Sequence, residues 1–300
     1  MSKTFIFGAM ATLTAVFASC GKGGGSEDRS PMLLSSQIEG HTTRADGGVW
    51  AGGEQVQVAL GSEGGRTFVA SVDGTLTPAT TIYWQDYSSR LIARAWHPAV
   101  GAYIFPVDQS DQAKFQSADF VFAPEVRNVT AGNSRLTFVH CLAKVTAALS
   151  AGDGVTADDL AAAVVSFSGY TTVVPNTAAG VVTGSGENDW IASFRTGNTC
   201  SVLLAPQTMT GKPFFKVTAR GAPQIWEPMA ADSVQLRAGY SYDYAVTVEK
   251  EGLVVTATGS SAWGSGSSST VPGGRDTTPA TGSTTWGAGS DDTVTGQTKP

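Results

Sequence analysis

The sequence of 300 residues predicts an all-β protein, built as β-sandwiches or β-barrels. Short runs rich in Val, Ile, Thr, Phe and Tyr recur along the chain and stop at Gly, Pro, Asn or Asp, which is typical of strands and turns. Charged residues make up only 15% of the chain and Gly numbers 36, so the helix formers Glu, Lys and Arg are scarce. Long helices are therefore not expected.

The first twenty residues indicate an export signal. Lys3 precedes an apolar stretch too short to span a membrane, and small residues lead to Cys20. The run Phe17-Ala18-Ser19-Cys20 resembles the lipobox of bacterial lipoproteins, in which the signal is cut before the cysteine and the thiol is acylated. We therefore expect a lipoprotein signal peptide at 1–19, lipidation of Cys20 and a Gly-rich flexible tether at 20–31. An ordinary signal with an incidental cysteine is the alternative.

Strand-like runs fill the body of the chain after a candidate first strand at 32–38. They lie at 55–60, 67–72, 81–84, 90–96, 120–123, 136–149, 163–167, 181–183, 201–205, 214–219, 240–248 and 253–257. One short helix is expected at 156–162, with Thr156 as N-cap and Asp159 completing a capping box. The Gly-rich polar stretch after residue 150 predicts a boundary between domains at 32–150 and 151–258. Periodicity alone leaves one long barrel open.

Residues 259–300 form a tail of different composition, without Leu, Ile, Phe or Tyr. The tail holds a repeat, in which 283–296 matches 260–273 and Trp286 stands where Trp263 does. We expect the Trp263 copy to pack on the second domain. The candidate donor-strand segment contains Trp263, Trp286 and Val294, and within it the copy with Trp286 and Val294 is the spare strand that pairs with a sheet edge, on its own subunit or on another. A disordered surface tail is the equal alternative.

Charge and motif content argue against several functions. The net charge of -6 disfavours nucleic acid as a partner. The sequence contains no H-x-x-x-H, C-x-x-C, G-x-S-x-G or phosphate-loop pattern, so no catalytic residue, metal site or cofactor is predicted. His140 and Lys144 are expected on one face of one strand, with His140 structural and Cys141 on the other face. Cys141 and Cys200 form a disulfide or stay as buried thiols.

Tryptophan content raises the alternative of sugar binding, because indole faces stack on pyranose rings. Five of the seven tryptophans lie in or beside predicted strands, where large aromatic side chains usually belong to the core. They are Trp50, Trp84, Trp96, Trp190 and Trp226.

The order of several short motifs resembles that of the fimbrillin family of Bacteroidetes, the type V pilins and their relatives, over about residues 32–266. An opening with Thr43-Arg44 and Trp50 precedes the second strand, a Phe-x-His-x-x-Ala-Lys run covers 138–144, and Pro206-Gln207 ends a later strand. A closing pattern runs from Leu236 through Gly239 and Gly252 to Trp263.

This resemblance implies two tandem transthyretin-like Greek-key β-sandwich domains. It also implies a structural or adhesive subunit, or an accessory protein, of a cell-surface fimbrium, carried to the outer membrane by a palmitate-type lipid anchor. Its partners would be other fimbrial subunits, in a homo- or hetero-polymer, and a host or glycan ligand. The alternative function is a surface glycan-binding lipoprotein of a nutrient-uptake system.

The resemblance further implies assembly by strand exchange. Family subunits are cut by an Arg-specific protease near the first strand, and Arg44 lies between the candidate strand 32–38 and the next strand at 55–60. Loss of the first strand opens an apolar groove, which a C-terminal strand of a neighbouring subunit fills. The alternative is that Arg44 is a surface arginine of a lipoprotein that never polymerises.

Overall fold

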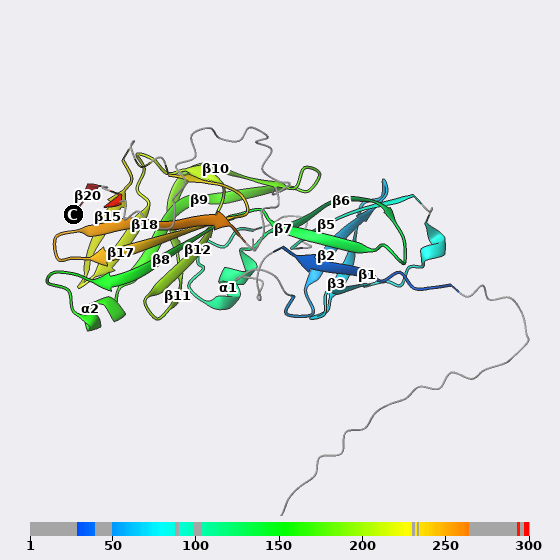
Figure 1. The fold of residues 1–300 in the computed structure, drawn as a ribbon, viewed down its shortest axis with the longest axis horizontal. Coiled ribbons are helices and arrows are strands. Elements are labelled where there is room, and N and C mark those ends of the chain that lie inside the picture. The colour runs from blue at the N-terminus through cyan, green and yellow to red at the C-terminus, as the bar shows by residue number, and fades with distance from the viewer. Residues whose placement is uncertain are drawn as a thin grey trace, which may run out of the picture.

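The computed structural model describes residues 29–39, 50–87, 90–98, 104–229, 232 and 234–263, and the short strands at 293–294 and 297–299. Strands dominate this part of the chain, so the all-β prediction is confirmed. Figure 1 shows two lobes along the long axis of the molecule. Strands β1 to β7 form one lobe, called here the first unit, and the strands from β8 onward form the second unit.

The first unit is a ring of seven strands in the order β1-β4-β3-β2-β5-β6-β7, closed by pairing of β7 with β1. Alternating apolar residues point inward along these strands, as in β2, which buries Val56, Val58 and Leu60. The strands are β1 (Leu34–Ile38), β2 (Gln55–Leu60), β3 (Gly65–Ala70), β4 (Thr75–Pro78), β5 (Leu91–His97), β6 (Val121–Val129) and β7 (Arg135–His140).

The second unit stacks two sheets, ordered β10-β9-β14-β15-β20 and β11-β12-β8-β17-β18-β19. Phe215 of the first sheet contacts Trp226 of the same sheet and Tyr244 of the other, with ring centroids 5.2 and 5.0 Å away. The strands are β8 (Ala143–Ala151), β9 (Val164–Asn176), β10 (Val181–Ala192), β11 (Phe194–Thr196), β12 (Thr199–Leu204), β13 (Gln207–Thr208), β14 (Phe215–Ala219), β15 (Ala222–Glu227), β16 (Gln235–Leu236), β17 (Tyr240–Val248), β18 (Leu253–Ala262), β19 (Thr293–Val294) and β20 (Gln297–Lys299).

The boundary predicted at residue 150 is wrong by one strand. The run 136–149 divides into β7 of the first unit and β8 of the second, which pairs with β12 and β17. Cys141 and Leu142 carry the chain across, and both are buried in the second core. No Gly or Pro marks this crossing because the chain continues into another sheet without reversing. The second unit also extends past residue 258, because β18 ends at Ala262 and Trp263 is buried.

The helices α1 and α2 and the 3-10 turn η1 lie between strands in the described part of the chain. The predicted helix is confirmed as α2 (Ala157–Ala161), with Thr156 and Asp159 forming the capping box. Helix α1 (Gln112–Ser117), capped by Asp111, has no counterpart among the predicted elements. The 3-10 turn η1 (Trp84–Asp86) covers part of the region 81–84 that was expected to be a strand.

The two units meet in a packed junction. The segment that carries α1 lies between β5 and β6 in the chain, yet its Phe105 and Phe115 are buried in the second core. The fully buried side chain of Gln109 donates to the carbonyl of Leu203 and accepts from its N–H, at 3.0 and 2.8 Å. Phe122 of β6 also belongs to the second core. A segment of the first half of the chain is therefore built into the second unit.

Candidate functional site

Strand β1 fills a position between β4 and β7, here called the β1 slot. It pairs antiparallel with β4 at Leu34 and Ser35, and parallel with β7 from Ser35 to Ile38. Met32, Leu34 and Ile38 are 0%, 1% and 4% exposed, whereas Leu33 on the opposite face is 47% exposed. Burial thus alternates as in a strand with one buried face, and the candidate first strand is confirmed as β1.

Trp50 ties the β1 slot to the beginning of β2. Its indole N–H donates to the Ser36 hydroxyl at 2.8 Å, and that hydroxyl donates to the carbonyl of Gly74 at 2.7 Å. The ring of Trp50 meets Phe138 of β7 edge-on, with centroids 5.2 Å apart. A chain without β1 would leave this buried indole N–H without its partner.

Several predicted site residues lie outside the described residues. Arg44 belongs to the segment 40–49, between Glu39 and Trp50, and both Cys20 and Trp286 are likewise outside. Processing, lipidation and the role of the Trp286 copy therefore stay predictions.

The C-terminal tail contributes a strand to each sheet of the second unit. Strand β19 pairs with β18, with Val294 opposite Val255, and β20 pairs with β15, with Thr298 opposite Trp226. Figure 1 shows β20 beside β15 at the end of the molecule remote from β1. The segment that contains Val294 thus pairs with sheet edges of its own chain, at β18 and β15.

Trp263 is fixed in the core of the second unit, as expected for its copy of the repeat. It is 7% exposed and stacks on the ring of His140 with centroids 3.7 Å apart and planes inclined by 11°. The Lys144 ammonium lies 5.8 Å from the indole centroid. His140 and Lys144 were expected in one strand and occupy two, β7 and β8, yet both reach the same indole because Trp263 lies at the junction of the units.

His140 is a structural histidine. Its Nδ1 lies 3.0 Å from Oδ1 of Asp119, and both side chains are fully buried. Cys141, next to His140 in the chain, and Cys200 of β12 are free buried thiols, so the disulfide alternative is not realised. Burial raises the pKa of the Cys141 thiol far above its ordinary value and also raises the pKa of Cys200. Both remain protonated and unsuited to nucleophilic attack at neutral pH.

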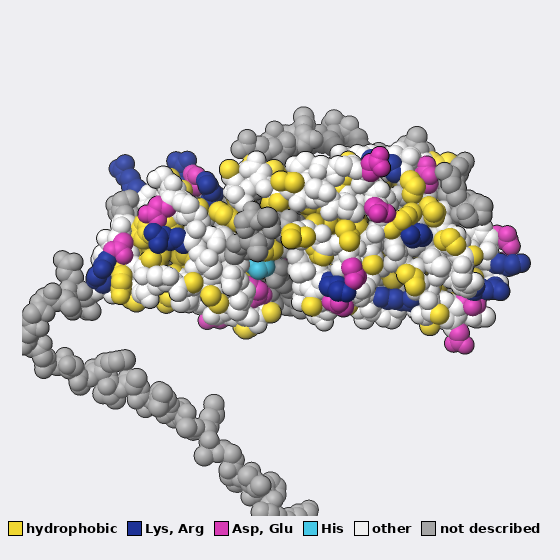
Figure 2. Space-filling model, turned by 180° about the vertical axis from the view of Figure 1, so that it is seen from behind, with side chains coloured by type: hydrophobic (Ala, Val, Ile, Leu, Met, Phe, Trp, Pro, Cys, Tyr) yellow, Lys and Arg dark blue, Asp and Glu magenta, His cyan; other side chains and the backbone are white. Residues whose placement is uncertain are grey.

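The described residues contain neither a metal-binding cluster nor a membrane-spanning helix. Among these residues no group of three or more His, Cys, Asp or Glu side chains could hold a metal ion. None of their helices is long and apolar enough to cross a membrane. Lys and Arg side chains are interspersed with Asp and Glu side chains over the face in Figure 2.

Comparison with known proteins decides the family. The model of the fimbrillin-like family matches residues 43–262. The chain belongs to the fimbrillin-like family. This match runs from Thr43, beside Arg44, to Ala262 at the end of β18, so it covers both units except β1, β19 and β20. No curated protein matches the sequence significantly.

Solved structures share the fold of this fimbrillin-like chain. A proposed cell adhesion protein from Bacteroides uniformis matches with a TM-score of 0.63 and 22% identity, over 80% of this chain and 100% of its own. A second, from Bacteroides ovatus, gives a TM-score of 0.61 and 16% identity, over 79% of this chain and 99% of its own. At such identities the likeness concerns the fold.

Proposed function

We propose that this protein is a structural and adhesive subunit, or an accessory protein, of a cell-surface fimbrium, and that subunits assemble by strand exchange. Membership of the fimbrillin-like family supports the fimbrial role. The double pairing of β1 carries the assembly step, because β1 alone closes the ring of the first unit between β4 and β7. Its departure would create two unpaired strand edges, which recruit another strand.

Proteolysis after Arg44 is the proposed trigger. Arg44 is the only Lys or Arg between the end of β1 at Ile38 and the start of β2 at Gln55. A cut there would separate β1 covalently from the body. Departure of β1 would expose to water the core positions that Met32, Leu34 and Ile38 fill. Burial of each such side chain stabilises the fold by about 1.5–3 kcal/mol. The emptied slot would therefore bind a new apolar strand strongly.

The C-terminal tail of a neighbouring subunit is the proposed incoming strand. Strands β19 and β20, with Val294, already complete sheet edges within one chain, which supports the capacity of the tail for strand addition. The segment 264–292, which contains Trp286, spans at most roughly 100 Å when fully extended, enough to reach an adjacent subunit. Trp263 is excluded from the donor segment because its side chain is buried in its own subunit.

The same proposal anchors the precursor in the outer membrane through an acylated Cys20. The partners are then other fimbrial subunits, and exposure at the cell surface allows contact with a host or glycan ligand. A lipid chain contributes about 0.8 kcal/mol for each buried methylene, so several chains on one cysteine give stable attachment.

The test is N-terminal sequencing and mass spectrometry of the protein from the surface of the producing cell. We expect polymers whose chains begin at Ala45, with a precursor that begins at acylated Cys20. Arg44→Ala should abolish both the Ala45 terminus and the polymers. Arg29→Ala is the matched control, because Arg29 precedes β1 and a cut there would leave β1 in its slot. Recovery of intact, Cys20-led chains alone would refute processing, and polymers of uncut chains would refute the role of β1 release.

A further inference from the structure

Trp190 differs from the other tryptophans that the structure describes. Five of these belong to a hydrophobic core or pack against one: Trp50, Trp84, Trp96, Trp226 and Trp263. Trp190 belongs to neither core, although its place in a strand predicted a core position. It lies in β10 opposite Ser168 of β9 and is half-buried. A large aromatic side chain kept out of both cores calls for another use.

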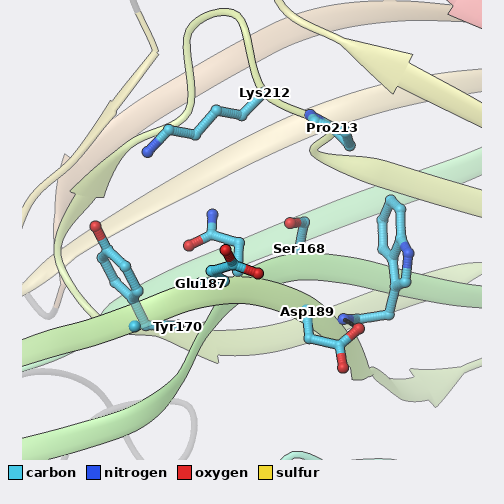
Figure 3. A pocket seen from close by; sticks show the side chains of 9 residues that line it. Ser168, Tyr170, Glu187, Asp189, Lys212 and Pro213 are labelled. Atoms are coloured by element: carbon cyan, nitrogen blue, oxygen red, sulfur yellow. Dashed lines mark hydrogen bonds between the residues drawn. The ribbon is translucent and has the colours of Figure 1, made fainter.

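Trp190 and Tyr170 form two walls of a pocket on the outer face of the β9–β10 hairpin. In Figure 3 the Tyr170 ring lies to one side of Ser168, with Lys212 and Pro213 of the β13–β14 loop above; Trp190, which pairs with Ser168, completes the lining. The cavity measures about 330 Å³, at the small end of the range for ligand pockets. Ser168 is only 5% exposed, so a small residue forms the floor between two aromatic walls.

Both walls are held in place without a ligand. The Lys216 ammonium lies 4.3 Å from the centroid of the Trp190 indole, and Lys216 is not part of the pocket lining. The ring of Tyr170 packs over Gly184, where a Cβ atom would overlap it. Gly within a strand marks such a close approach. Preorganised aromatic walls bind with less loss of side-chain entropy.

The polar groups of the pocket favour a neutral, hydroxyl-rich ligand. The lining carries Glu187 and Asp189 against Lys212, and the Lys216 ammonium on the Trp190 indole lies just outside it, so the four formal charges in and beside the pocket balance. Asn188 stands opposite Tyr170, and its amide has a carbonyl acceptor and two N–H donors, one of which is directed at Met209 Sδ with the nitrogen 3.8 Å from the sulfur. A saccharide ring has apolar C–H groups on its faces and hydroxyl groups at its edge. The C–H groups can pack on the two aromatic walls, while the hydroxyl groups meet the polar residues around the pocket.

We propose that this pocket binds a neutral saccharide. The pocket lies in the second unit, whereas the β1 slot lies in the first, so the proposal goes beyond assembly and is independent of it. Saccharide binding is measured on the unassembled monomer, and its failure would leave the assembly proposal untouched.

The experiment titrates the chain without its signal peptide and Cys20, residues 21–300, with cellotriose, chitotriose, maltotriose and mannotriose, and with sialyllactose as the acidic counterpart. Binding is followed by saturation-transfer NMR and calorimetry. We expect at least one neutral trisaccharide to bind more tightly than sialyllactose. Trp190→Ala should weaken that binding at least about fivefold, and Trp190→Phe less. Asn188→Ala, which keeps both aromatic walls, should also weaken it.

Tyr240→Ala is the control variant, because Tyr240 is another half-buried aromatic residue outside both cores and outside the pocket. It should bind the trisaccharide like the unaltered chain. Circular dichroism and thermal unfolding establish that each variant is folded. The proposal fails when none of the neutral probes binds at about 10 mM. It fails equally when Trp190→Ala binds like Tyr240→Ala, or when sialyllactose binds more tightly than every neutral probe.

Discussion

Replacement of Leu34 by Ala tests how much β1 contributes to the first unit. The Leu34 side chain is 1% exposed, and Leu34 stands opposite Leu76 in the pairing of β1 with β4. Truncation of a fully buried leucine costs about 2–5 kcal/mol, from lost transfer free energy and the remaining cavity. For a unit of this size the midpoint of thermal unfolding should fall by roughly 8 °C or more.

The adjacent Leu33 supplies a matched control. Leu33→Ala removes the same atoms from a side chain that is 47% exposed, so we expect a change within about 0.5 kcal/mol. Calorimetry measures the midpoint. Hydrogen exchange with mass spectrometry localises the loss to peptides of β4 and β7, with β12 and β17 of the second unit as internal reference.

Cleavage provides the decisive comparison. A chain that begins at Ala45 lacks β1 and therefore lacks residue 34. Once β1 has been removed, the cut Leu34→Ala protein and the cut unaltered protein must have the same stability. Equal stability of the uncut Leu34→Ala and unaltered proteins would refute the reasoning, as would a loss of the same size in Leu33→Ala.

Two further predictions concern the junction and the tail. Gly180→Ala should destabilise the protein by about 1–3 kcal/mol more than Gly186→Ala in urea unfolding, because both glycines have positive φ but only at Gly180 would a Cβ atom overlap Phe122. Equal losses of unfolding free energy in the two variants would show that backbone strain, and not the contact with Phe122, causes the destabilisation. Truncation after Gly282 removes β19 and β20 and should abolish polymer formation by the processed protein, as seen by electron microscopy. Unchanged polymers and an unchanged midpoint of unfolding would make the tail a passive extension.

Local sequence patterns determined much of the fold. The alternation at 55–60 and 240–248 predicted β2 and β17 with the bounds that the structure shows, because one buried face of a strand needs only a period of two. Thr156 and Asp159 predicted α2, since a capping box is completed within one turn. The run 32–38 likewise indicated β1, the element on which the assembly proposal depends, but only the structure showed that Leu33 faces away from the core.

The tertiary structure alone decided which strands share a sheet and which side chains meet. The chain passes from β7 to β8 through Cys141 without a turn residue, so local pattern could not divide the run 136–149. Stacking of Trp263 on His140 joins positions far apart in the sequence. Trp190 resembled the core tryptophans because strand propensity does not say which face of a sheet is covered. That face was settled by Ser168 opposite it and Lys216 two strands away, contacts that arise only when β9, β10 and β14 pair.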